Sequence, residues 1–168
     1  SLSPASPALW DERNRPIVRL HDPEASLESV DEIAVFNGAN AAYLGGEIIQ
    51  YRDAVLLPDG RYELRGLLRA RLGSDAFLAT HEIGAAFIAL DSVGVASIAT
   101  NLGHVGQVRN YRAVGALELV ETAESQQFLF QARNLRPLSP VHVKALKMPN
   151  GDIALSWVRR SRMGAEWI

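Results

Sequence analysis

Residues 59–72 read DGRYELRGLLRARL, and this stretch decides the fold. The Asp-Gly pair at its start tolerates the positive φ of a tight turn. After it, one parity is small or apolar and the other is mostly charged, as in a strand with one buried face. The first parity holds Tyr62, Leu64, Gly66, Leu68, Ala70 and Leu72, and the second holds Arg61, Glu63, Arg65, Leu67, Arg69 and Arg71. We predict a strand here that bulges or bends at Gly66.

Short apolar runs also lie on both sides of this stretch. Asn37-Gly38 and Gly45-Gly46 are further turn dipeptides, and residues 48–57, 85–90, 108–113 and 127–132 have the apolar, β-branched or alternating pattern of strands. Residues 17–20 predict a short strand and residues 26–32 a single helical turn. No helical periodicity of useful length occurs between residues 33 and 158. The sequence therefore predicts an all-β protein with a barrel or sandwich-like core.

Proline positions divide the chain. The many prolines of the first 23 residues indicate an extended lead-in over residues 1–32. Residues 136–140, RPLSP, read as a linker, so we expect one β domain over 33–137. Residues 138–168 then form a hairpin around Pro149-Asn150-Gly151-Asp152. A length of 168 residues fits one domain plus a fragment, and a start at Ser1 suggests a piece of a longer polypeptide or a processed chain.

Composition excludes several classes of protein. The formal net charge of −2 offers no general attraction for nucleic acid or an anionic membrane. The absence of cysteine rules out disulfides, thiolate catalysis and iron–sulfur clusters. No apolar run approaches the length of a membrane helix, and there is no secretory signal. We expect no nucleic-acid partner and no membrane insertion.

Catalytic motifs are incomplete. His81-Glu82 lacks the second histidine of a zinc-protease helix, and Gly103-His104-Val105-Gly106 lacks the third glycine of a dinucleotide loop. The four histidines are far apart in sequence, which favours surface or turn positions for His21, His81, His104 and His142. Scattered carboxylates are expected on solvated turns and strand faces rather than in a glycosidase pair, and these are Asp53, Asp59, Glu63, Asp91 and Glu118. We predict a protein that is not an enzyme, with no catalytic residue, cofactor or metal.

Three groups of residues remain as candidates for binding. The strand arginines form a basic stripe that is either an assembly surface or a solvated face balanced by Glu63, and they are Arg61, Arg65, Arg69 and Arg71. Arg159, Arg160 and Arg162 form a second such group. Tyr111 and Trp167 are candidates for glycan contact, whereas Trp157, on an alternating strand, is expected in the core.

Several segments together resemble one family, the tail-tip hub or host-specificity (putative tail) proteins of long-tailed phages and gene transfer agents, in their C-terminal part. They cover most of residues 37–168 and leave out the first thirty or so. The segments are NGANAAYLGGEIIQYRDA (37–54), LPDGRYELRGLLRARLGSD (57–75), HEIGAAFIALD (81–91), VRNYRAVG (108–115), RPLSPVHVKA (136–145) and GDIALSWVRRSRMGAEWI (151–168). Many of these proteins have Arg-Gly-Arg-x-Gly-Thr where this chain has Arg69-Ala70-Arg71-Leu72-Gly73-Ser74.

The resemblance implies a structural part of a tail tip, or baseplate hub, that mediates assembly and connection to fibres or receptor-binding parts. Its partners would be other tail-tip proteins, with a homotrimer in the full-length protein. It would be made in the bacterial cytoplasm and reside in the virion tail tip. The final hairpin is similar to the start of a fibronectin type III module, which is truncated here because a full module needs about 100 residues. The alternative is a carbohydrate-binding module that contacts the host surface.

Overall fold

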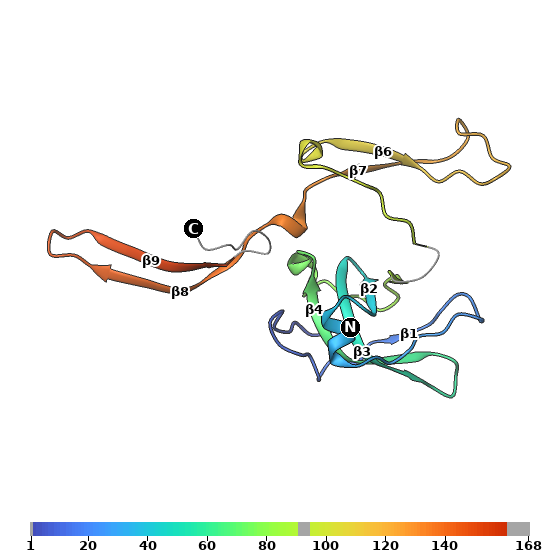
Figure 1. Ribbon diagram of the computed structural model, residues 1–168, viewed down its shortest axis with the longest axis horizontal. Helices are drawn as coiled ribbons and strands as arrows, with labels where there is room; N and C mark the ends of the chain where they lie inside the picture. The colour runs from blue at the N-terminus through green and yellow to red at the C-terminus, as the bar shows by residue number, and fades with distance from the viewer. Residues whose placement is uncertain (1, 91–94, 161–168) are drawn as a thin grey trace. The chain divides into compact units, whose positions relative to one another are not determined.

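The structure, a computed structural model, describes residues 2–90 and 95–160, and it is mainly β (Figure 1). The chain divides into two compact units, residues 1–96 and residues 97–168. The first unit contains one antiparallel sheet of five strands in the order β1-β4-β3-β2-β5. These strands are β1 (Ile17–Val18), β2 (Ala41–Leu44), β3 (Glu47–Leu56), β4 (Tyr62–Arg71) and β5 (Phe87–Ala89). The predicted mainly β fold is confirmed.

The predicted turns form where glycine allows positive φ. Gly45 and Gly46, with φ of 55° and 101°, join β2 to β3, and Gly60, with φ of 79°, lies in the turn from β3 to β4. Only glycine adopts such angles without a steric penalty. These tight connections place β2, β3 and β4 side by side in sequence order.

One short helix precedes the sheet. Helix α1 (Glu32–Phe36) begins after Asp31, whose Oδ1 accepts a hydrogen bond of 2.7 Å from the amide of Ala34. The predicted helical turn over residues 26–32 was therefore misplaced. The N-cap carboxylate of Asp31 satisfies a free amide of the first turn, so the helix starts after it rather than before it.

The core of the first unit is an apolar cluster made by β1, β2, β3 and β4. Its buried members are Val18, Ala42, Leu44, Ile49, Tyr51, Leu64 and Leu67. Ala42 and Leu44 of β2 have the two-residue spacing of a single strand face, as do Ile49 and Tyr51 of β3. Burying each large member stabilises the fold by roughly 1.5–3 kcal/mol relative to its exposed state.

The second half of β4 is buried on both faces. Leu64 and Leu67 are both fully buried in the same cluster, although a regular strand would place residues three apart on opposite faces. Gly66, between them, has φ of 58°, which confirms the predicted irregularity. The sequence pattern did not reveal that the residues after Gly66 are buried on both parities, Leu67 and Arg69 as well as Leu68 and Ala70.

A second irregularity follows in the same strand. β4 has one residue more than β3 between the pairs Gln50–Leu68 and Ile48–Arg71, and Ala70 in this bulge has φ of 54°. A left-handed conformation favours glycine. The structure thus gives a reason for the glycine that the resembling proteins carry at this position.

The second unit contains two hairpins, described here one at a time. Strands β6 (Val108–Arg112) and β7 (Ser125–Leu129) form one, and β8 (Leu138–Lys147) and β9 (Ile153–Arg160) form the other. The predicted turn of the second hairpin is confirmed by Gly151, whose amide donates to the carbonyl of Met148. The first unit also contains the 3₁₀ turn η1 (Asp75–Phe77), and the second contains η2 (Leu102–His104) and η3 (Arg133–Leu135).

The expectation that Trp157 lies in the core is wrong. Its side chain is 58% exposed, and its neighbours on the same hairpin Ile153 and Leu155 are 66% and 61% exposed. A two-stranded sheet has no second layer of its own, so alternation alone does not bury a side chain. The predicted domain boundaries at residues 32 and 137 stay predictions.

Substitution of Gly66 by alanine should lower the free energy of unfolding by about 1–3 kcal/mol. The alanine would have to keep the positive φ of Gly66, and its Cβ would lie only 3.0 Å from Cζ of Arg52. Gly60→Ala is the control, because its φ is also positive but nothing lies within 4 Å of its added Cβ. Urea denaturation monitored by circular dichroism measures both. Equal losses in the two variants would contradict a role for the close approach to Arg52.

Candidate functional site

The structure separates the four arginines that the sequence grouped in one stripe. Arg61 pairs with Asp59 at 2.6 Å, Arg65 pairs with Glu63 at 2.6 Å, and Arg71 donates to Oε1 of Gln50 at 2.9 Å. Arg69 is fully buried. The expectation that Arg69 belongs to an exposed face is wrong, because both faces of β4 are covered in this part of the strand, where Leu68 and Ala70 are buried as well.

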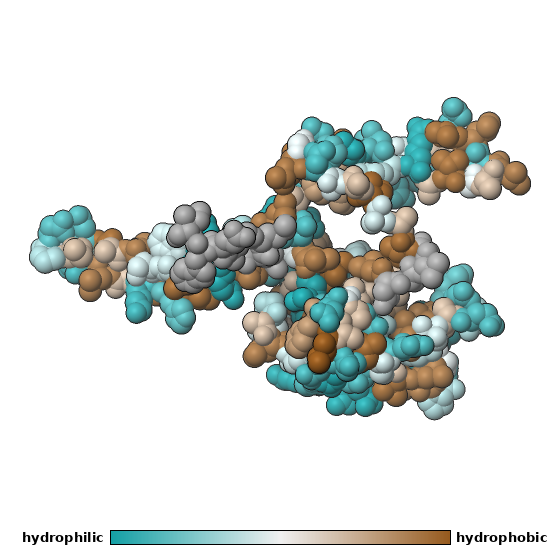
Figure 2. Space-filling model, in the orientation of Figure 1, coloured by the Kyte–Doolittle hydropathy of each residue, from teal (hydrophilic) through white to brown (hydrophobic). Residues whose placement is uncertain are grey.

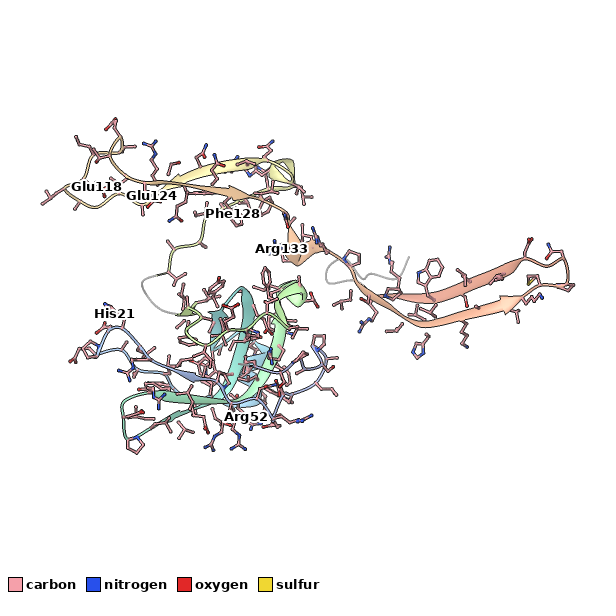
Figure 3. All side chains as sticks on the ribbon, turned by 180° about the vertical axis from the view of Figure 1, so that it is seen from behind. His21, Arg52, Glu118, Glu124, Phe128 and Arg133 are labelled. Atoms are coloured by element: carbon pink, nitrogen blue, oxygen red, sulfur yellow. The ribbon has the colours of Figure 1, made fainter. Side chains whose placement is uncertain are left out.

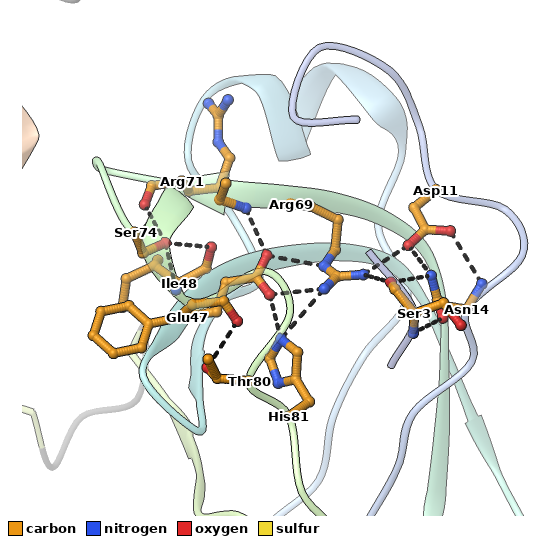
Figure 4. A network of polar contacts seen from close by, with 12 residues as sticks. Ser3, Asp11, Asn14, Glu47, Ile48, Arg69, Arg71, Ser74, Thr80 and His81 are labelled. Carbon is orange, nitrogen blue, oxygen red and sulfur yellow. Dashed lines mark hydrogen bonds and ion pairs between the residues drawn. The ribbon is translucent and has the colours of Figure 1, made fainter. Parts of the chain in front are cut away.

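Arg69 is the centre of a buried polar cluster (Figure 4). Its Nε and Nη2 donate to Oε1 and Oε2 of Glu47, from β3, at 2.9 and 2.8 Å. Its Nη1 donates to Oδ2 of Asp11 at 2.9 Å. The side chains of Asp11, Glu47 and Arg69 are all at least 98% buried. The two-bond contact with Glu47 uses the planar fork that only arginine provides.

The N-terminal segment is held by this cluster. Asp11 exchanges two backbone hydrogen bonds with Leu67 of β4, at 2.8 and 3.1 Å. Its carboxylate accepts hydrogen bonds from the backbone and side-chain amides of Asn14, at 3.0 and 2.6 Å. Nη1 of Arg69 also donates to the carbonyl of Ser3 at 3.3 Å, and Ser3 and Asn14 bond to each other. Residues expected in an extended lead-in therefore supply part of the buried network.

Glu47 has two further donors. The amide of Ala70 donates to Oε1 at 2.6 Å, and Nε2 of His81 lies 2.5 Å from Oε2. An ionised carboxylate only accepts hydrogen bonds, so Nε2 of His81 carries the proton. The side chain of His81 is 97% buried, and its Nδ1 has no hydrogen-bond partner in the described part of the chain. The prediction that His81 is a surface or turn residue is wrong.

Both carboxyl groups are held in the ionised form. Burial alone would raise the pKa of Glu47, but hydrogen bonds from Arg69 and Ala70 and the charge of Arg69 lower it below its ordinary value. Burial likewise opposes ionisation of Asp11, and hydrogen bonds from Asn14, Arg69 and Arg13 lower its pKa. In Arg69, burial would lower the pKa, and the contacts with Glu47 and Asp11 raise it. The cluster is a buried network of ion pairs that links the N-terminal segment to β3 and β4.

A second arginine fastens the same segment from the exposed side. Nη1 of Arg52 lies 3.1 Å from Glu12 and 3.3 Å from Glu32, and Nη2 lies 3.1 Å from Asp53 (labelled Arg52 in Figure 3). Its guanidinium also lies 5.6 Å from the ring centroid of Trp10, a cation–π distance. Arg52 is partly solvated, so these pairs contribute less than the Arg69 cluster.

A pocket of about 930 Å³ opens beside the cluster. Its wall is formed by residues 13–19 and residues 81–87, together with Leu2, Leu44 and Arg61. His81 thus belongs both to the buried cluster and to the pocket wall. In the residues that the structure describes, no group of three or more His, Cys, Asp or Glu side chains can hold a metal ion. No helix of the described chain is long and apolar enough to span a membrane.

The predicted glycan residues are placed only in part. Tyr111, on β6, packs edge-on against Phe128 of β7 with ring centroids 6.4 Å apart. Trp167 lies outside the described residues, as does Arg162 of the second basic group. A glycan contact by these residues stays a prediction.

Sequence reasoning missed the partners of Arg69. Asp11 and Glu47 are 58 and 22 residues away from it along the chain, so no local spacing connects them. The alternation of residues 61–72 gave no signal either, because it assumes one exposed face and this part of β4 is buried on both faces.

Comparison with known proteins gives one family. A family model described as Rcc01698-like, C-terminal, matches residues 1–88, slightly more than half of the chain. No curated protein matches the chain. The match includes the first thirty or so residues, which the sequence resemblance wrongly leaves out. It also contains every member of the Arg69 cluster.

Removal of the buried cation should strongly destabilise the first unit. Arg69→Met leaves two buried carboxylates unpaired and should lower the free energy of unfolding by about 3–5 kcal/mol. Arg65→Met, which breaks a pair whose arginine is 41% exposed, should cost at most about 1 kcal/mol. Urea denaturation measures both. Arg69→Lys keeps the charge without the planar fork, and its loss of unfolding free energy should lie between those of the other two variants. Equal stability of all three variants would refute a stabilising role for the buried ion pairs.

The lowered pKa values of Asp11 and Glu47 also predict an acid-sensitive fold. Their contribution is fully present above the unfolded-state values, near pH 4, and is lost as pH falls through the lower folded-state values. The free energy of unfolding of the wild type should therefore decrease between about pH 5 and pH 2. Urea titrations at several pH values measure this slope. In Arg69→Met the decrease should shrink, and an unchanged slope would show that the acid sensitivity arises elsewhere.

Proposed function

We propose, from the premise that the chain belongs to the Rcc01698-like, C-terminal family, that it is a structural component of the tail tip of a phage or gene transfer agent. In this role it mediates assembly and connects the tail to fibres or receptor-binding parts. The resemblance of residues 37–168 to tail-tip hub proteins supports this function. Other tail-tip proteins would be its partners, with a homotrimer in the full-length protein. It would act in the virion after synthesis in the bacterial cytoplasm.

The observation that carries the proposal is the exposure of apolar side chains in residues 97–160. Figure 2 shows hydrophobic residues at the surface of both hairpins. In β8 and β9, pairing places Ala145 opposite Leu155 on one face, and Trp157 follows on the same face two residues later. An isolated hairpin is at best marginally stable in water, and a contiguous apolar face marks an interaction site. These hairpins have the character of parts that are completed by neighbours.

The buried cluster supports a non-enzymatic role. Both of its carboxylates are tied to Arg69, and Glu47 also accepts from Ala70 and His81. A general acid or base must exchange its proton with a substrate, whereas these groups are held ionised and enclosed. We assign the cluster to stability and the hairpins to assembly.

Particle assembly tests the proposal. In a strain that produces such particles, replacing the chain's gene with one that encodes Leu155→Ser and Trp157→Ser should lower DNA transfer or infectivity at least about tenfold, through the loss of apolar contact area. Both side chains are more than half exposed, so the melting temperature of the isolated chain should be unchanged. Leu9→Ser with Leu56→Ser is the matched control, because these residues are 68% and 61% exposed in the first unit.

Mass spectrometry of purified particles provides a second readout. The tryptic peptide DAVLLPDGR, residues 53–61, should be present in wild-type particles. It should be absent from particles of a strain in which the gene is deleted, and electron microscopy should show tails without a complete tip. Absence of the peptide from wild-type particles, or normal tails and transfer in the deletion strain, would refute the tail-tip function.

A further inference from the structure

The pocket of the first unit lies between the two edge strands of the sheet. β1 and β5 occupy the two ends of the strand order β1-β4-β3-β2-β5. Residues of both strands, Ile17 and Val18 from β1 and Phe87 from β5, line the pocket. Val18 and Phe87 also pack in the same apolar cluster. The sheet is therefore curved so that both of its open edges border one groove.

Backbone groups of these edges point away from the sheet. The amide of Leu64 donates to the carbonyl of Pro16, and that of Gly45 to the carbonyl of Ala86. Because hydrogen-bonded pairs alternate in an antiparallel ladder, Ile17 and Phe87 direct their N–H and C=O groups outward. Outward backbone groups on an edge strand are the template on which an extended peptide adds as a further strand.

Exposed arginines lie along the β1 side of the groove, and one of them, Arg19, acts on Asp59 through its charge at longer range. Arg13, Arg15 and Arg19 line the pocket and are exposed, and none of them has a carboxylate partner within 4.0 Å in the described part of the chain. Arg15 and Arg19 share one parity, so in an extended chain they lie on one side, about 13 Å apart, and Arg13 precedes them in a bend. By contrast, Arg52, Arg61, Arg65 and Arg69 all have carboxylate partners.

Most of the charged side chains that line the groove are positive. Arg61 adds a fourth guanidinium to the wall, although Asp59 pairs with it, and Glu82 is the acidic residue among those that line the pocket. The groove therefore complements a negatively charged ligand. Arginine is well suited to carboxylates because its donors match their two oxygens.

The apolar part of the wall favours a peptide over a sugar. Leu2, Ile17, Leu44 and Phe87 contribute aliphatic and aromatic surface between the charged positions. Phe87 is the aromatic residue in this wall, so the groove lacks the stacked platform of aromatic rings typical of a site for sugar rings. Alternating apolar and acidic side chains on an extended peptide would meet the apolar wall and the arginines in turn.

We propose that this groove binds an extended acidic segment of a partner protein, which adds as a strand to the edge at β1 and pairs its carboxylates with Arg13, Arg15 and Arg19. The inference rests on the proposed assembly function, since it names the kind of partner that the first unit holds. It is independent of the apolar hairpins of the second unit.

Binding of a synthetic peptide to the purified full chain tests the groove. The probe is acetyl-EVELEVEL-amide carrying a fluorescent dye, measured by fluorescence anisotropy at low and high salt. Binding should weaken with salt, because exposed ion pairs are screened. The same peptide with glutamine in place of glutamate should bind about tenfold more weakly. A version with N-methylated alternate amides should lose binding, because it cannot form the strand ladder.

Matched variants locate the site. Arg13→Gln, Arg15→Gln and Arg19→Gln together should weaken binding of the acidic peptide about tenfold, with no change in the melting temperature of the chain. The control is Arg133→Gln, Lys144→Gln and Lys147→Gln, which removes the same charge from exposed positions of the second unit. The control should bind like the wild type.

Three results would overturn the inference. If no peptide binds, the three arginines serve only to protect the sheet edge from unwanted pairing. If the N-methylated peptide binds as well as its parent, no strand is added. If an oligogalacturonate of equal charge binds as tightly as the peptide, the groove is a site for acidic glycans. Because the assay needs no particle, each of these outcomes leaves the assembly experiment above unaffected.

Discussion

The fold of the first unit depends on one buried cation. Arg69 lies between Glu47 and Asp11 with its side chain fully buried, and desolvating a charge in this way is costly unless every donor and acceptor finds a partner. The partners of Arg69 come from the N-terminal segment and from β3, and the loop that carries His81 supplies a further donor to Glu47. If any one of these segments moved away, a charged side chain that stays buried would lose its partner. The cluster thereby defines one arrangement of segments that the apolar contacts alone would specify less strictly.

Sequence patterns predicted the local structure well, and they failed where the outcome depends on distant residues. The turns at Gly45-Gly46 and Gly60 and the strand after them follow from dipeptide chemistry and alternation. The irregularity at Gly66 was also predictable, yet the burial of the following residues on both faces was not. Whether Arg69 faces water or the core depends on Asp11 and Glu47, and no periodicity reports that contact.

The two units differ in how much of their apolar surface is buried. In the first unit, a curved sheet covers its own apolar cluster with Leu2, Leu27 and Phe87 packed around it. In the second, residues such as Leu117 and Trp157 remain exposed on hairpins or their loops. Alternation in β9 was a correct signal for a strand and a poor signal for burial, because burial requires a second layer that a hairpin does not contain. The exposed apolar side chains of the second unit are the basis of the assembly role that we propose.

The separation of the cluster's members along the chain also constrains when the protein can fold. Asp11 is synthesised early, but the cluster has all its members only after His81 has been added and has left the ribosome. Until then the nascent N-terminal segment has no buried cation to pair with, and it stays hydrated. The first unit should therefore acquire its structure late and in one step, when most of residues 1–88 are available.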